Sequence, residues 1–145
     1  MADNFDQSLG FVIHDVARML RWEFDKRAQT IGLTRSQWSV LAYLRREDGA
    51  QQQRLAELME LTPITMTGLL DRLERDGWVE RRPDPEDRRA KRIFLTEKVA
   101  PVMKKIQALG KEVRQSAVEG LSEAEQQKLI SLLLRVRTNL STKSA

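Results

Sequence analysis

Residues 73–97 of the chain read LERDGWVERRPDPEDRRAKRIFLTE, and they are the most informative part of the sequence about its architecture. Two short runs within it, 78–81 and 92–95, are rich in the β-branched and aromatic residues that favour strands. The segment between them, 82–91, holds two prolines and many charges, which are typical of an exposed loop. The stretch therefore predicts a charged β-hairpin.

Immediately before this hairpin, the sequence predicts two short helices joined by a tight turn. The first begins near Gln51, and the turn falls at residues 60–61. Thr62 is a good N-cap for the second helix, and Pro63 suits its first position, where no backbone N–H is needed. Apolar residues recur in this helix at positions 66, 69, 70 and 73, so one of its faces is predicted to be buried before Gly77 ends it.

Upstream of this unit, apolar residues at steps of three and four predict a long amphipathic helix over residues 5–31. Gly32 is placed to end that helix. Thr34 and Gln37 have the spacing of a capping box, in which each side chain accepts a hydrogen bond from a backbone amide of the next helix. That next helix is expected to end near residue 48.

Downstream of the hairpin, two further long helices are predicted. Thr96 is expected to cap the first of them, and Pro101 is expected to bend its start. Ser122 and Glu125 form a second capping box, which opens a last helix to about residue 140.

The chain, residues 1–145, is thus expected to hold a compact unit at 34–95 and flanking helical regions at 5–31 and 96–140. The flanking helices carry apolar stripes and have few partners within the compact unit. Such stripes must be buried somewhere, and packing against the same helices of a second chain is the natural solution. The pattern predicts a two-fold symmetric homodimer.

The composition excludes several classes of protein. The 145 residues include no cysteine, which rules out disulfides, thiolate metal sites and cysteine redox sensors. With one histidine and no glycine-rich phosphate loop, no catalytic, metal or cofactor site is recognisable, so an enzyme is not expected. Apolar runs are too short for a membrane span, and a cytoplasmic protein is expected. The net charge of +4 is mild, so the position of the charges matters more than their sum.

Two helices joined by a tight turn and followed by a charged hairpin are the layout of a winged helix-turn-helix, in a mainly α (α+β) fold. The second helix can enter the DNA major groove while the hairpin reaches the minor groove. Positions 62–70 carry no charge, so small hydroxyl and apolar groups there can approach base edges and thymine methyls. The same periodicity also occurs in an ordinary core helix.

The hairpin, or wing, is strongly basic. Residues 81–92 include six basic side chains and three acidic ones. Arginine on a narrow loop suits the negative potential of the minor groove. Asp87 is expected to pair with a nearby arginine and so fix the tip. Two alternatives to DNA binding remain: a merely solvated loop, and a winged helix that docks on another protein. Salt titration with duplex DNA would distinguish the protein-docking module from a DNA-binding one.

The chain closely resembles the MarR family of bacterial transcription regulators. The likeness is carried by residues 73–82 and 87–97, and by LAELMELT at 55–62; DRRAKR at 87–92 is similar to the branch typified by SlyA. The resemblance implies a sequence-specific, double-stranded DNA-binding regulator that acts as a homodimer on an inverted-repeat operator. It also implies a repressor that a small aromatic or phenolic acid releases from DNA.

The resemblance assigns DNA contacts to the wing and to the second, or recognition, helix. The implied wing residues are Asp87, Arg88 and Arg89. The implied helix residues are Thr62, Pro63, Ile64, Thr65, Thr67, Gly68 and Arg72. Gly68 departs from the family pattern, because many relatives have an arginine there that often touches DNA, and its absence puts the base preference in doubt.

An effector pocket is the remaining candidate site. His14, Arg18 and Trp22 recur at intervals of four residues on one helix face, and with Trp38 they could surround a carboxylated ring. The alternative is that Trp38 belongs to the core and that His14 and Arg18 are surface or interface groups.

Overall fold

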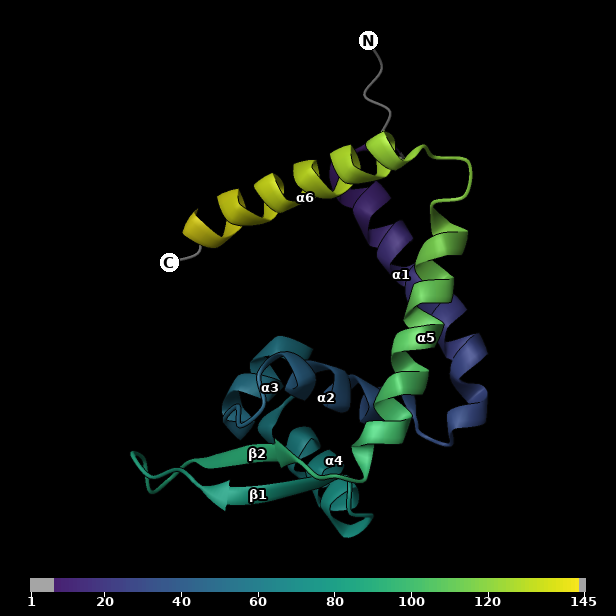
Figure 1. The fold of residues 1–145 in the computed structure, drawn as a ribbon. Helices are drawn as coiled ribbons and strands as arrows, with labels where there is room; N and C mark the ends of the chain where they lie inside the picture. Colours follow the sequence, from purple (N-terminus) through teal and green to yellow (C-terminus); the bar gives the residue numbers. More distant parts are fainter. Residues whose placement is uncertain (1–6, 144–145) are drawn as a thin grey trace.

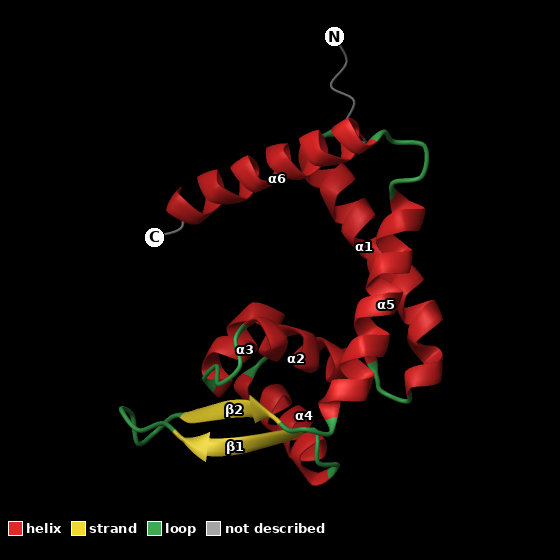
Figure 2. Ribbon diagram, in the orientation of Figure 1, coloured by secondary structure: helices red, strands yellow, loops and turns green. Residues whose placement is uncertain are grey.

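A computed structural model of the chain describes residues 7–143 (Figure 1). It is mostly helical, with one small antiparallel sheet (Figure 2), as the sequence predicts. In chain order the elements are α1 (Leu9–Ala28), a 3₁₀ turn (Gln29–Ile31), α2 (Arg35–Arg46), α3 (Gln52–Met59), α4 (Pro63–Arg75), β1 (Val79–Pro83), β2 (Lys91–Leu95), α5 (Val99–Ala117) and α6 (Glu123–Lys143).

The strands β1 and β2 form a hairpin whose register runs from Val79 opposite Leu95 to Pro83 opposite Lys91. Both strands differ slightly from the prediction. Trp78 stands outside β1 because its backbone N–H donates to the carbonyl of Leu73, completing a Schellman-type end to α4. At the other end the ladder continues one pair beyond Arg82, so the loop between the strands shortens to residues 84–90.

The core of the winged unit lies between α2, α3, α4 and the hairpin. The four apolar positions of α4 are all buried, as predicted. The largest fully buried side chains come from each of these elements: Val40, Leu41, Leu44, Leu55, Met66, Leu70, Leu73 and Ile93. Burying each such side chain contributes about 1.5–3 kcal/mol, so this packing fixes where α4 and the hairpin sit.

Helix α1 packs along α5, and the pair forms a column beside the winged unit (Figure 1). The prediction of one helix over 5–31 needs correction at its end. Helix α1 ends at Ala28 and continues as the 3₁₀ turn, because Gly32 adopts a left-handed conformation at φ 80° and tightens the last turn. The predicted start at Phe5 lies outside the described residues.

The predicted cap of α5 is wrong. Thr96 does not cap the helix, because its hydroxyl donates to the carbonyl oxygens of Gly77 and Trp78, and α5 begins only at Val99. Pro101 is the third residue of α5, within the first turn, where backbone amides have no intrahelical partner, so the ring displaces no hydrogen bond.

Both predicted capping boxes are confirmed. Thr34 Oγ1 accepts from the amide of Gln37 at 3.2 Å, and Gln37 Oε1 accepts from the amide of Thr34 at 3.1 Å. At α6, Ser122 and Glu125 make the same reciprocal pair at 2.9 and 3.1 Å. Local sequence alone therefore places the starts of α2 and α6.

Helix α6 extends from the far end of α5 and stands apart from the winged unit (Figure 1). Large apolar side chains of α1 and α6 are exposed on the single chain: Leu9, Phe11, Val12, Ile13, Val16, Met19, Trp22, Leu129, Ile130, Leu132, Leu133, Leu134 and Leu140. None of the helices in residues 7–143 combines the length and apolarity needed to cross a bilayer. Within the same residues, no three or more histidine and acidic side chains gather as a metal site would require.

Candidate nucleic-acid interface

The turn between α3 and α4 is built as predicted. Glu60 ends α3 in the left-handed conformation at φ 55°, and the amide of Leu61 donates to the carbonyl of Ala56 at 2.9 Å. The hydroxyl oxygen of Thr62 then accepts from the amide of Thr65 at 3.2 Å, while Pro63 occupies the first helical position. This capped turn aims the N-terminus of α4 into solvent.

The solvent face of α4 presents the helix residues that the resemblance implies. The side chains of Thr62, Pro63, Ile64, Thr65, Thr67 and Arg72 are exposed, and Gly68 is half-buried. Three hydrogen bonds made by the side chains of Gln52, Thr67 and Arg72 organise this face. Thr67 accepts from Gln52 Nε2 and donates to the carbonyl of Pro63, both at 2.9 Å. Arg72 Nε reaches back to the carbonyl of Gly68 at 3.3 Å.

The tip of the wing is held by Asp87, in a way that differs from the prediction. Asp87 Oδ1 accepts from the backbone amide of Arg89 at 3.0 Å, and the Asp87 carbonyl accepts from the amide of Ala90 at 3.1 Å. The carboxylate thus braces the loop through the backbone, as aspartate commonly does in turns. The guanidinium groups of Arg88 and Arg89 make no hydrogen bond or ion pair with the rest of the described chain.

The root of the wing depends on Asp84, which the sequence did not single out. Its side chain is almost fully buried, the residue being 4% exposed, and it accepts from Gln51 Nε2 at 2.8 Å and from the amide of Glu86 at 2.8 Å. Arg92 Nε lies 3.0 Å away. The hydrogen bond from Gln51, the amide of Glu86 and the charge of Arg92 together lower the pKa of Asp84. This carboxylate fastens the wing to the start of α3.

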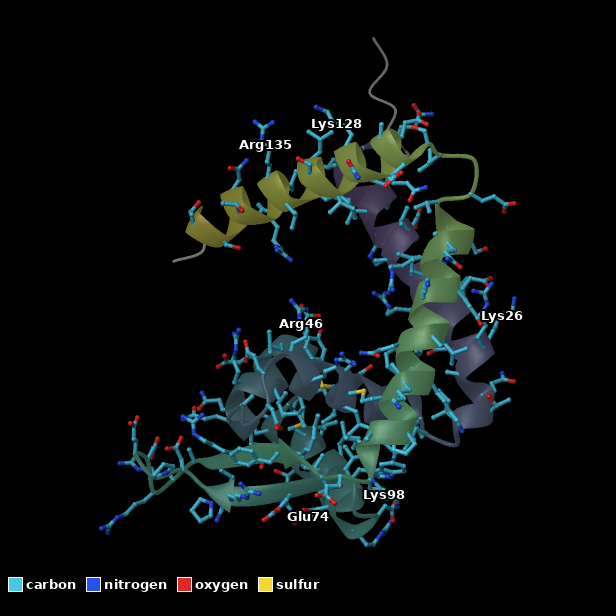
Figure 3. The ribbon with its side chains drawn as sticks, in the orientation of Figure 1. Lys26, Arg46, Glu74, Lys98, Lys128 and Arg135 are labelled. Atoms are coloured by element: carbon cyan, nitrogen blue, oxygen red, sulfur yellow. The ribbon has the colours of Figure 1, made fainter. Side chains whose placement is uncertain are left out.

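A second cluster joins the recognition helix to the first strand of the wing. Arg81 lies between Glu74 and Asp71, with its Nη2 at 2.9 Å from Glu74 Oε1 and 2.6 Å from Asp71 Oδ1. The backbone amide of Arg81 also donates to Glu74 Oε2 at 2.8 Å. These bonds lower the pKa of Glu74, chiefly through the Arg81 amide and then its side chain. Glu74 occupies the α4–β1 junction in Figure 3.

The structure brings the wing tip and the recognition helix to one groove of about 900 Å³. Helix α4 contributes Pro63, Met66 and Thr67 to its lining, and the wing contributes Arg81, Asp87, Arg89, Ala90 and Lys91. The remaining lining residues come from α3 and the turn after it: Gln52, Gln53, Ala56, Glu57, Glu60 and Leu61. Two groups of residues about 20 positions apart in the sequence therefore form one surface. Ile64 and Gly68 face an adjacent hollow on α4.

The four effector-pocket candidates fall into two places. Arg18 stacks over Trp22 at 4.7 Å and pairs with Asp15 at 3.1 Å, on a part of α1 where Trp22 is exposed. His14, one turn earlier, is also exposed. Trp38 packs instead against Phe24, with ring centroids 4.3 Å apart. Because Phe24 follows Trp22 by two residues on a helix, the two side chains point to roughly opposite sides of α1.

Comparison with known proteins places this interface in a family. Residues 33–91 match the sequence model of the MarR family. The solved structure of transcriptional regulator PA3341 is 36% identical, with a TM-score of 0.80 over 93% of this chain and 99% of that one. That of the transcriptional regulator SlyA is 31% identical, with a TM-score of 0.77 over 94% and 96%.

A third similar structure was solved with DNA. A mutant MarR from E. coli, complexed with operator DNA, is 28% identical, with a TM-score of 0.75 over 93% of this chain and 99% of that one. These similar structures cover both the winged unit and the flanking helices of this chain, and nearly the whole length of their own chains. The chain belongs to the MarR family of winged-helix, DNA-binding transcription regulators.

Proposed function

We propose that this protein regulates transcription by binding a specific double-stranded DNA site as a homodimer. In each copy, α4 enters the major groove and the loop at 84–90 follows the minor groove. One observation carries the proposal: the arginine-bearing wing tip and the N-terminal turns of α4 border the same groove. The similar MarR structure that holds operator DNA supports the same partner.

The electrostatics of this surface suit a nucleic acid. Arg88 and Arg89 project from a braced loop without intramolecular acidic partners among the described residues, so their charge is available to phosphates. The positive end of the α4 dipole faces the same side, and residues 62–70 add no acidic group that would repel DNA.

The proposed homodimer is supported by the apolar surface that one copy leaves exposed. On α6, Leu129, Leu133 and Leu140 lie on one stripe, and Ile130 and Leu134 widen it beyond the face that a single neighbouring helix would cover. The N-terminal half of α1 exposes a similar stripe. Two copies related by a two-fold axis would bury both and would place both α4 helices on one side of the duplex, facing an inverted repeat with half-sites about 10 base pairs apart.

We further propose that the protein is a repressor of the SlyA-like branch, released by a small aromatic acid. The residues DRRAKR at 87–92 support the branch. Arg18, stacked on Trp22 beside His14, offers the acid a cation and an aromatic face. Trp38 packs against Phe24 and is not part of this group. Displacement of the protein from DNA by phenolic acids, and its loss in Arg18→Ala, would test this role.

DNA binding is tested by selecting duplexes from a random pool with the purified chain and titrating the selected duplex with salt. Because each phosphate contact releases counterions, the affinity should fall steeply and linearly on logarithmic axes. A protein that docks only on other proteins would show little affinity for any duplex in dilute buffer, and that result would refute the proposal.

A further inference from the structure

The recognition helix carries a hollow on its solvent face, beside the groove shared with the wing. It is lined by Pro63, Ile64, Thr67, Gly68 and Asp71. Gly68 forms its floor because it has no side chain, and Ile64 stands one turn earlier on the same face. Ile64 is 86% exposed, more than any other large apolar side chain in residues 7–143. Such exposure of an isoleucine next to a hollow indicates a surface made for contact.

Neither the backbone nor the packing of α4 requires glycine at position 68. A Cβ added there would meet only Arg72 Nη2, at 3.8 Å, which is ordinary van der Waals contact with a flexible side chain. The backbone at Gly68 is helical, so any residue would adopt it. Glycine inside a helix is nevertheless destabilising relative to alanine. Its place on the DNA-facing side therefore points to close approach of a ligand rather than to folding.

The chemistry of the hollow narrows what that ligand group is. Pro63 has no N–H, and Ile64 and Gly68 have no polar side-chain atoms. Thr67 already gives its hydroxyl hydrogen to the carbonyl of Pro63 at 2.9 Å. Asp71 can only accept hydrogen bonds, and its carboxylate lies 2.6 Å from Arg81. The hollow thus offers apolar contact and no side-chain hydrogen-bond donor.

We propose that Ile64 and Gly68 read the C5 methyl group of a thymine, and so specify one T·A pair in each half-site. That methyl is the apolar group that an unmodified base pair presents in the major groove. Its contact with Ile64 would remove both from water, and the absence of a side chain at Gly68 would admit the base edge. The inference rests on the proposed entry of α4 into the major groove and adds the feature that the helix recognises there.

The test uses the full chain and a duplex selected from a random pool. Each thymine of the duplex is replaced in turn by deoxyuridine, which lacks only the C5 methyl. Burial of one methyl group corresponds to about a fourfold change in affinity. We expect about a fourfold weaker binding when the thymine read in one half-site is replaced, and the product of the two effects when both are.

Variants assign the effect to the hollow. Ile64→Ala and Gly68→Ala should reduce the thymine-to-deoxyuridine affinity ratio at that position to about one, because each alters the surface that holds the methyl. Arg75→Ala is the matched control, since Arg75 is exposed on the same helix but lines neither the hollow nor the groove shared with the wing, and it should keep the wild-type ratio.

The possible results separate the two proposals. If the chain binds the selected duplex and no thymine responds to loss of its methyl, the reading role of Ile64 and Gly68 is refuted and DNA binding stands. The same holds if a responsive thymine keeps its ratio in both variants. If the chain binds no duplex, the proposed function fails, and this inference fails with it.

Discussion

Glu74 on the recognition helix and Arg81 on the first wing strand are joined by three hydrogen bonds of 2.8 to 3.1 Å, one of which comes from the Arg81 backbone amide. The backbone bond fixes where β1 starts relative to α4, and the side-chain bonds fix the rotation of the strand. These bonds hold α4 and the wing in a fixed arrangement, which would preorganise both for the proposed contacts with the two grooves of DNA.

Glu74→Gln should destabilise the protein by about 1 kcal/mol at neutral pH, a value reduced for the partial exposure of the pair. The pKa of Glu74 is lowered in the folded state, so its stabilising effect is present above its ordinary pKa and is lost as the pH falls through the lowered one. The difference from wild type should therefore shrink between pH 7 and pH 3. Urea unfolding at several pH values measures it. An equal difference at every pH would contradict the ion pair, and Glu119→Gln, an exposed glutamate, serves as the control.

Arg89→Ala should weaken binding to many DNA sequences alike, because in the proposed complex this wing arginine lies against the backbone and minor groove rather than one base. The slope of log affinity against log salt should become shallower by about one unit for each wing engaged. Lys128→Ala removes the same charge from α6, far from the wing (Figure 3), and should leave the slope as it is. An unchanged slope in Arg89→Ala would argue against any role of the wing.

Leu133→Lys should dissociate the dimer. Leu133 lies in the apolar stripe of α6 that is exposed on the single chain and would be buried in the proposed dimer. A lysine ammonium buried there would find no acidic side chain in the same stripe. Sedimentation equilibrium at micromolar concentration should show wild type as a dimer and the variant mainly as a monomer. Lys128→Ala, a change on the polar side of α6, should remain dimeric. A wild-type monomer would remove the basis for the two-fold arrangement.

Gly68→Ala should stabilise the protein by about 0.5–1 kcal/mol, because alanine is the better helix former and its methyl group meets no obstacle. Urea unfolding at fixed protein concentration measures the gain. Gly110→Ala in α5 is the comparison, since a Cβ there meets Arg114 at 3.2 Å and the gain should be smaller. Destabilisation by Gly68→Ala would mean that the fold itself needs this glycine.

Asp84→Ala should loosen the wing without unfolding the helices. Its carboxylate is the shared acceptor for Gln51, the Glu86 amide and Arg92, and no other acidic side chain reaches those three donors among the described contacts. Hydrogen exchange should become faster at the wing amides, including that of Glu86, and stay as in wild type along α5. Uniform protection in the wing would show that β1 and β2 hold it without Asp84.

The sequence predicts those parts of the fold that local rules control. The apolar spacing of α4, its Thr62 cap and the glycine at 77 identify a helix with one buried face and both its ends. Thr96 shows where such rules stop. Its position in the sequence suits a helix cap, but folding brings the carbonyl of Gly77 close, and the Thr96 hydroxyl donates its hydrogen bond to that carbonyl instead. A tertiary partner of this kind leaves no local pattern.

The site divides in the same way. The charged wing and the uncharged helix face are visible as composition, so their exposed residues are predictable. Asp84 resembles any charged loop residue until folding places Gln51 and Arg92 around it, with the flanking prolines as the only sequence hint. Glu74 and Arg81 are separated by the turn at Gly77, and their pairing depends on the angle at which the strand leaves it.

The end of α4 and the start of α5 lie close together at one corner, on either side of the hairpin in the sequence, and several contacts hold them there. Lys98 lies at this corner (Figure 3). Its Nζ donates to the carbonyl of Asp76 at 2.6 Å and lies 4.3 Å from the Trp78 ring, and the hydroxyl of Thr96 donates to the carbonyl of Gly77. Helix α5 is about 28 Å long, so a tilt of about 5° about its far end moves this corner by about 2.5 Å. That travel approaches the 3.4 Å rise of one base pair. In the proposed dimer, a small tilt of α5 at its remote end would therefore be enough to shift the two winged units out of register with the two half-sites of the duplex.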